Sequence, residues 1–185
     1  GLSRGLRDAG FKLVAAVELD QLAAATFRAN HSRTKILVKD IRDVTPEELL
    51  AQAGGRRVDL VAGCAPCQGF CSLTSKQKRD DPRNTLVLQM ARFIQGIGPA
   101  VVMMENVPGL AARGAEIFGQ FLGELERLGY LAEWKIVQMA DYGVPQSRRR
   151  LVLLAGRGFR IPFPEPTHAK HPTDGSRLPW LTLKD

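Results

Sequence analysis

The residue with the clearest chemical potential in this chain is a cysteine that follows a short apolar run. Val58 to Gly63 is typical of a buried strand, and Cys67 comes directly after it in Pro66-Cys67-Gln68-Gly69. Proline restricts the backbone before the thiol and glycine relaxes it afterwards, so the thiol can be held and aimed into a cleft. A nucleophilic role requires cations or N–H groups that lower the thiol pKa from about 8.5. We therefore take Cys67 as the candidate nucleophile, against the alternative of a small buried hydrophobic residue.

Two other kinds of cysteine chemistry fit the same segment. Cys64 and Cys67 have the spacing of a redox-active pair, which leaves a thiol-disulfide oxidoreductase open. Cys64, Cys67 and Cys71 also suggest a metal or iron–sulfur site, but such a site normally needs a fourth ligand. The chain has only three cysteines, and none of its three histidines is spaced to complete the set, so we predict no metal.

A carboxylate and an amide follow a second apolar run. Ala100 to Met104 predicts a strand, and Glu105 and Asn106 come next. In a parallel sheet the carboxyl ends of the strands meet at one edge, so Glu105 is expected to share a cleft with Cys67. A solvated strand-to-turn junction is the alternative for Glu105 considered alone.

Three arginines precede another apolar run, Leu151 to Ala155. Strand alternation turns Arg148 and Arg150 to one side and Arg149 to the other. Two guanidinium groups on one side could bind phosphate or orient a base carbonyl. A solvated basic start to the strand is the alternative.

Acidic residues mark the ends of two predicted strands near the N-terminus. In dinucleotide and adenosyl folds, a carboxylate at the end of such a strand binds ribose hydroxyls, and Glu18 has this position. Gly1 fits the last glycine of the turn that precedes the strand. Asp40 is similarly placed to accept a hydrogen bond from an adenine amino group. Together these positions indicate a cofactor that contains adenosine.

The elements that must position these residues alternate along the chain. The predicted strands are 13–19, 35–41, 58–63, 100–107, 131–138 and 150–155, and the predicted helices are 3–9, 21–30, 46–53, 84–97 and 116–128. Thr45-Pro46-Glu47-Glu48 is a capping-box start for the third helix. This alternation predicts an α/β fold with a doubly wound, mostly parallel sheet. We expect a catalytic and cofactor-binding domain over 1–157 and, because prolines recur after Gly158, a linker over 158–185.

Composition narrows the partners. The 185 residues include 26 Lys and Arg against 19 Asp and Glu, and the net charge of +7 favours a polyanion. No apolar run approaches the roughly 20 residues that span a bilayer, and no secretory signal pattern is present, so we expect a cytoplasmic protein without a membrane partner.

The motifs together resemble the cytosine-C5 DNA methyltransferase family. The matching blocks are Gly63-Cys64-Ala65-Pro66-Cys67-Gln68-Gly69-Phe70, Glu105-Asn106-Val107 and Gln146-x-Arg148-x-Arg150, in that order. The resemblance implies the Rossmann-like fold of S-adenosylmethionine-dependent methyltransferases, double-stranded DNA as substrate and S-adenosylmethionine as methyl donor. It leaves room for a tRNA substrate, because the family has a tRNA-acting branch, and for a cognate restriction endonuclease as partner in a bacterial, nucleoid-associated setting.

The resemblance also assigns roles. Cys67 attacks C6 of a flipped-out cytosine, Glu105 contacts N3 and the exocyclic amine, Arg148 and Arg150 hold the base oxygen and backbone, and Asn106 braces the active-site loop. The residues that it assigns to the cofactor are Glu18, Leu19, Asp40, Ile41, Pro66 and Leu86.

The family pattern also extends beyond this chain. Its first strand, most of its glycine-rich loop and its target-recognition region are absent, so we expect the 185 residues alone to be weakly active or inactive. The missing region is expected in the same or a second chain, and a non-catalytic DNA-binding half of a split enzyme stays open.

Overall fold

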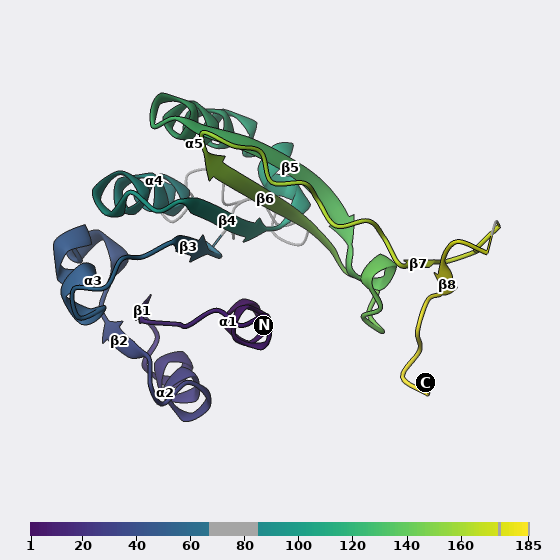
Figure 1. Cartoon of the computed structure of the whole chain (residues 1–185), viewed down its shortest axis with the longest axis horizontal. Helices are drawn as coiled ribbons and strands as arrows, with labels where there is room; N and C mark the ends of the chain where they lie inside the picture. Colours follow the sequence, from purple (N-terminus) through teal and green to yellow (C-terminus); the bar gives the residue numbers. More distant parts are fainter. Residues whose placement is uncertain (67–84, 174, 185) are drawn as a thin grey trace. The chain divides into compact units, whose positions relative to one another are not determined.

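The computed structural model describes residues 1–66, 85–173 and 175–184. Cys67, the candidate nucleophile, lies outside the described residues, as does Cys71. The chain forms two compact units, one of residues 1–59 with 92–98 and the other of residues 60–91 with 99–185 (Figure 1). Each unit is described by itself.

The first unit contains a two-stranded parallel sheet. β1 (Ala15–Glu18) pairs with β2 (Lys35–Val38), in a register that places Glu18 opposite Val38. Helix α2 (Gln21–Asn30) connects the two strands, and the Asp20 carboxylate accepts from the Ala23 N–H at 2.7 Å to cap its first turn. The unit also contains α1 (Leu2–Asp8), the 3₁₀ turn η1 (Ile41–Asp43) and α3 (Pro46–Gln52).

The second unit is built on a four-stranded sheet in the order β3-β4-β6-β5. β3 and β4 are parallel, whereas β6 runs antiparallel to both β4 and β5. The strands span β3 Leu60–Gly63, β4 Val101–Asn106, β5 Tyr130–Gln138 and β6 Arg149–Arg157. The helical elements are α5 (Ala115–Arg127) and the 3₁₀ turns η5 (Pro108–Ala111) and η6 (Met139–Tyr142), and α4 (Leu86–Ile97) runs from this unit into the first.

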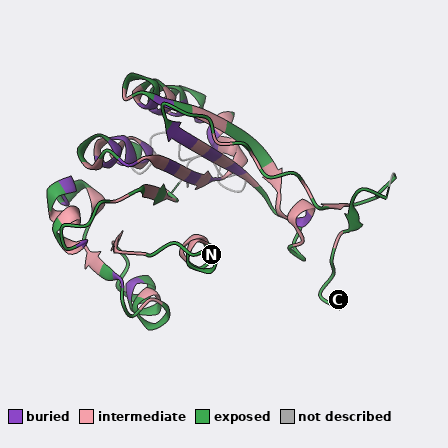
Figure 2. Ribbon diagram, in the orientation of Figure 1, coloured by how far each residue is buried: buried purple, intermediate pink, exposed green. Residues whose placement is uncertain are grey.

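The two faces of this sheet differ in burial. Along β4 every second side chain is buried, and Val102 and Met104 pair with Ala155 and Leu153 of β6, all at 0% exposure (Figure 2). Helix α5 covers this face. Its Phe118 meets the ring of Trp134 on β5 edge to face, with the centroids 5.3 Å apart. The opposite face, which carries Glu105, is only partly buried, so its polar side chains remain accessible.

The predicted elements are present with shifts of a few residues at their ends. The α/β class is confirmed, and β1–β2 and β3–β4 are parallel as predicted. The antiparallel direction of β6 was not predicted. After β6, residues 158–164 run beside β5, and the chain then adds two short parallel strands, β7 (His168–Ala169) and β8 (Leu178–Pro179) (Figure 1). They belong to the second compact unit, and the domain boundary proposed at residue 157 stays a prediction.

Candidate active site

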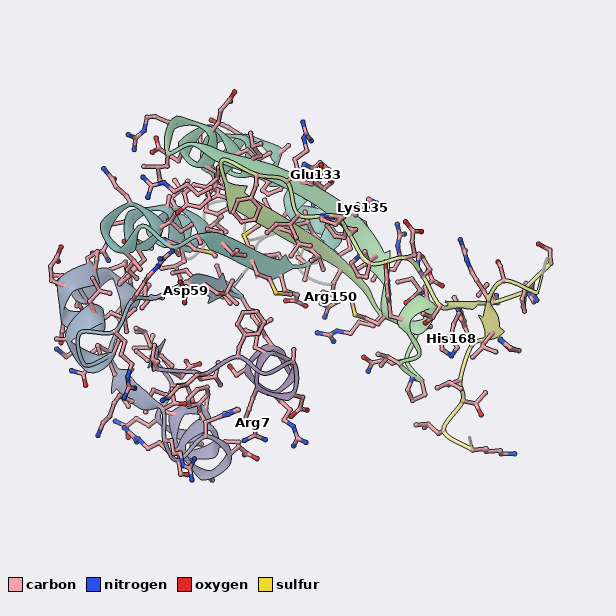
Figure 3. The ribbon with its side chains drawn as sticks, viewed as in Figure 1. Arg7, Asp59, Glu133, Lys135, Arg150 and His168 are labelled. Carbon is pink, nitrogen blue, oxygen red and sulfur yellow. The ribbon has the colours of Figure 1, made fainter. Side chains whose placement is uncertain are left out.

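A carboxylate and two guanidinium groups meet on the half-buried face of the second unit's sheet. The Arg150 Nε atom lies 2.8 Å from Glu105 Oε1, and the nearest Arg148 nitrogen lies 3.9 Å from the same oxygen. The Arg150 side chain is 20% exposed and that of Arg148 is 45% exposed. Arg150 is closer and less exposed, so it fixes the position of the Glu105 carboxylate (Figure 3). The Arg148 side chain remains open to solvent.

Strand register explains why these residues meet. Glu105 is paired with Val152, so Arg150 occupies the diagonal position two residues along β6 on the same face. The β4 residue after Glu105 is Asn106, which alternation turns to the buried face opposite Leu151. The side chains of Glu105 and Asn106, which are neighbours on β4, therefore point to opposite faces of the sheet.

Cys64 also lies at this edge of the sheet. It follows the Gly63–Met104 pair by one residue, which brings it beside Glu105. Cys64 is exposed by surface area, but protein atoms surround much of its thiol. Desolvation, the negative charge of Glu105 and a hydrogen bond to that carboxylate raise the pKa of Cys64 to about 11. Cys64 is therefore a protonated thiol at neutral pH, a poor nucleophile and a hydrogen-bond donor to Glu105.

Asn106 holds the segment that leads to Cys67. The Asn106 side chain, 3% exposed, donates to the Ala65 carbonyl oxygen at 3.1 Å and accepts from the Val107 N–H at 2.7 Å. On the same segment, a Cβ atom on Gly63 would lie 2.7 Å from the sulfur of Met90 on α4, so a larger residue there would require the Met90 side chain to move. These contacts fit the predicted bracing role of Asn106, which remains a prediction because Cys67 is outside the described residues.

Gln138 was not predicted from the sequence. It ends β5, and its Oε1 atom accepts from the Arg148 N–H at 2.7 Å while its Nε2 atom donates to Ser147 Oγ at 3.3 Å. The Met139 N–H donates to the Arg148 carbonyl oxygen at 2.9 Å. The only sequence signal for Gln138 was that a polar residue ends an apolar strand, and this signal is weak.

In the first unit, the predicted cofactor residues lie at the ends of β1 and β2. Glu18 Oε1 accepts from the Asp20 N–H at 3.0 Å. A carboxylate has two oxygens and about four acceptor positions, so capacity for ribose hydroxyls remains. Leu19 is 63% exposed and offers an apolar surface beside Glu18. Their roles toward a cofactor that contains adenosine stay predictions.

Asp40 is more committed to its own turn. Its carboxylate caps η1 through the Arg42 N–H and receives the Arg42 guanidinium on both oxygens, at 2.9 and 2.5 Å. These hydrogen bonds hold the pKa of Asp40 down, to about 2, so the group is an anion with some acceptor capacity left. Ile41 is the first residue of η1 and is half-buried.

The remaining candidates belong to the second unit. Pro66 is exposed and is the last residue described before Cys67, and Leu86 is the half-buried first residue of α4. Within the described ranges, no group of three or more His, Cys, Asp and Glu side chains has the geometry to hold a metal ion. The cysteine set of the metal alternative lies partly outside those ranges.

The sequence matches the family model described as C-5 cytosine-specific DNA methylase over residues 1–177. The chain belongs to this family. Among curated members, it is 40% identical over 174 residues to the type II methyltransferase M.XorII of Xanthomonas oryzae pv. oryzae, covering 90% of this chain and 41% of that protein. It is 38% identical to M1.HphI of Haemophilus parahaemolyticus, covering 96% of this chain and 49% of that protein. The chain therefore spans less than half the length of these two methylases.

A solved structure supports the same fold. A protein described as a candidate DNA modification methyltransferase encoded within a prophage (E. coli) superposes with a TM-score of 0.74 at 28% identity, covering 84% of this chain and 43% of that one. The methylase fold is thus the Rossmann-like α/β fold predicted from the sequence. In the part of the methylase chain that the structure describes, no helix is both long and apolar enough to cross a membrane.

Proposed function

We propose that the protein carrying this chain is a DNA cytosine-C5 methyltransferase that acts on a flipped-out cytosine in double-stranded DNA through a covalent adduct of Cys67. Family membership supports the reaction class. The observation that carries the proposal is the Glu105–Arg150 pair, 2.8 Å apart, at the same sheet edge as the segment that leads to Cys67. In this proposal the fixed carboxyl group acts together with the Cys67 thiolate.

The chemistry requires such a pair. C5 of cytosine is a weak nucleophile, but when the Cys67 thiolate forms a bond to C6 while a carboxyl group protonates or hydrogen-bonds N3, electron density moves to C5. S-adenosylmethionine, when bound, would supply an electrophilic methyl group for that carbon and would leave as S-adenosylhomocysteine. Loss of the C5 proton then expels the Cys67 thiolate and restores the aromatic ring. Because C5 and C6 are stacked inside a duplex, the base must leave the helix, at a cost of a few kcal/mol.

The proposed roles of the charged residues are consistent with their exposure. Glu105 contacts N3 and the exocyclic amine of the cytosine. Arg150 keeps the Glu105 carboxyl group oriented and contacts the base oxygen. Arg148, at 45% exposure, is free to reach a neighbouring phosphate. Asn106 steadies the loop through the Ala65 carbonyl oxygen.

Cofactor binding is proposed for six residues. In this proposal Glu18 binds the ribose hydroxyls, and Leu19, Asp40 and Ile41 contact the adenine. Pro66 and Leu86 add further contacts. No metal takes part in the proposed reaction.

The proposed setting is a bacterial cytoplasm, in association with the nucleoid. The net charge of +7 favours DNA as the partner. Its relatives are named type II methyltransferases, which makes a cognate restriction endonuclease a second proposed partner. Since the chain covers 41% and 49% of those relatives, the DNA-reading region is proposed to lie in the rest of the same protein or in a second chain. The 185 residues alone are then weakly active or inactive.

The test uses the whole protein, duplex DNA of varied sequence and S-adenosylmethionine with a labelled methyl group. We expect 5-methylcytosine in the digested DNA, and DNA should outcompete tRNA as substrate. DNA with 5-fluorocytosine at the methylated site should remain bonded to Cys67 after denaturation, because the ring then has no C5 proton to lose. Absence of label from every DNA and of any adduct would refute the proposal.

The oxidoreductase alternative receives no support from Cys64. A redox pair needs a thiolate, whereas the pKa of the Cys64 thiol is raised to about 11. The split-enzyme alternative is separated by adding the missing region as a second chain, where recovered activity supports a split catalyst.

A further inference from the structure

The turn that joins β5 to β6 carries Arg148. It comprises η6 and residues 143–148, and Gln138 and Met139 close it by hydrogen bonds to the backbone of Arg148. A nine-residue strand on each side fixes the ends of the turn, and η6 begins directly after β5.

The segment after β6 runs along the same face as Glu105. Its Arg160 lies 2.8 Å from the Glu133 carboxylate, and Lys135 stands 5.0 Å from the centre of the Phe163 ring. Glu133 and Lys135 pair with Leu154 and Val152 of β6, which places them on the half-buried face (Figure 3). The segment is thus directed along β5 toward η6.

At η6 this segment is bound at three points. The Tyr142 hydroxyl donates to the Pro164 carbonyl oxygen at 3.2 Å, and the Thr167 N–H donates to the Asp141 carbonyl oxygen at 3.0 Å. The Trp180 indole N–H donates to Asp141 Oδ1 at 2.8 Å. A hydrogen bond to a carboxylate is stronger than one between neutral groups, and this one joins residues 39 positions apart.

The remainder of the segment shapes the binding point. The Leu178 N–H donates to the Thr167 carbonyl oxygen at 3.0 Å, and the Trp180 N–H donates to the Ala169 carbonyl oxygen at 3.1 Å. These two bonds pair β7 with β8. The His168 ring lies 3.0 Å from where a Cβ atom on Gly143 would stand, and Gly143 has a φ of +79°. A side chain at this position would be strained and would displace the ring, so the turn is matched to the segment.

We propose that Asp141 and Trp180 are positioning residues, which hold the turn between β5 and β6 so that Arg148 is presented to DNA. The second half of this statement rests on the proposed function, and the first half does not. Neither residue touches the reacting atoms. They act through the backbone of residues 139–148.

The first experiment measures the turn itself, without DNA. In the whole protein, brief digestion with trypsin should cleave after Arg148 about tenfold faster when Asp141→Ala or Trp180→Phe removes the bond. Asp141→Asn keeps an acceptor for the indole and should restore most of the protection. Cleavage after Arg127, at the end of α5, serves as the internal control and should not change. An unchanged rate at Arg148, or an equal rise at Arg127, would overturn the proposal.

The second experiment links the turn to DNA through a double-mutant cycle. Asp141→Ala and Arg148→Ala should each weaken duplex binding, and the double variant should bind no more weakly than Arg148→Ala alone. Additive losses would overturn the link between Asp141 and Arg148. If Arg148→Ala has no effect on binding, the role of Arg148 in the proposed function fails, while the tryptic rates still decide whether Asp141 and Trp180 hold the turn.

Discussion

Arg150 Nε and Glu105 Oε1 lie 2.8 Å apart, joined across the antiparallel β4–β6 pair. A single guanidinium thus sets the direction of the carboxyl group that the proposed reaction needs. The contact is diagonal across the two strands, so it depends on strand register as much as on the two side chains.

Replacing this carboxyl group should stop catalysis more than folding. Glu105→Gln keeps the size of the side chain but removes its charge and its acid function, so we expect kcat for methyl transfer to fall by about 10²- to 10⁴-fold. Glu133→Gln removes an exposed ion pair from the same sheet and is the matched control. Equal kcat values for the two variants would argue against a catalytic Glu105.

The two arginines should fail in different ways. Arg150→Ala frees Glu105 and should lower kcat, whereas Arg148→Ala should weaken DNA binding and reduce the dependence of log K on log salt by about one unit. Binding titrations at several salt concentrations, together with single-turnover rates, distinguish the two. Identical profiles would contradict the division of roles.

The cysteines should separate by reactivity. Cys67→Ser should abolish methyl transfer and Cys64→Ser should largely spare it. With a pKa of about 11, only about one Cys64 thiol in a thousand is ionised at pH 8, so its alkylation by iodoacetamide should be slow. Glu105→Gln removes a charge that raises this pKa and should speed the alkylation, measured by fragmentation mass spectrometry. Fast labelling of Cys64 in the unmodified protein would contradict the Cys64–Glu105 contact.

Asp40 should titrate well below an ordinary aspartate. Its folded pKa of about 2 is lower than the usual 3.8, so the stabilisation from Arg42 is fully present above about pH 4 and is lost as the pH falls through 2. An NMR titration of the carboxyl carbon should give a midpoint near 2, and Arg42→Gln should move it upward. A midpoint that ignores Arg42 would show that the pair does not form in solution.

The buried face of the sheet should dominate stability. Leu153 on β6 is 0% exposed, and Leu153→Ala should lower the free energy of unfolding by about 2–5 kcal/mol. Leu131 on β5 is 43% exposed, and Leu131→Ala should cost much less. Urea unfolding of the whole protein, followed by circular dichroism, measures both.

The sequence predicted the elements well because each is specified locally. The helix start at Pro46 with Thr45 as its cap is confirmed, with the Thr45 hydroxyl accepting from the Glu48 N–H at 3.1 Å. The direction of β6 was missed because an apolar strand reads the same in a parallel or an antiparallel pair.

The arrangement around the site was less accessible from the sequence. The contact of Asp141 with Trp180 spans 39 positions, so no local pattern announces it. Gln138 was missed because its role depends on which strand returns beside it. The motif residues could be named from the resemblance, but their distances depend on register, and their roles stay predictions until they are measured.

The pairing of β4 with β6 also limits how this protein can vary. Because Arg148 and Arg150 are separated by one residue and Arg149 faces the other way, a slip of one residue in β6 would offer Arg149 to Glu105 and turn Leu151 and Leu153 out of the core. Insertions or deletions in the turn at residues 143–147 are therefore tolerated only when the pairing of Glu105 with Val152 is preserved. The length of the turn can change at the tip of this hairpin, but the register of β6 against β4 cannot.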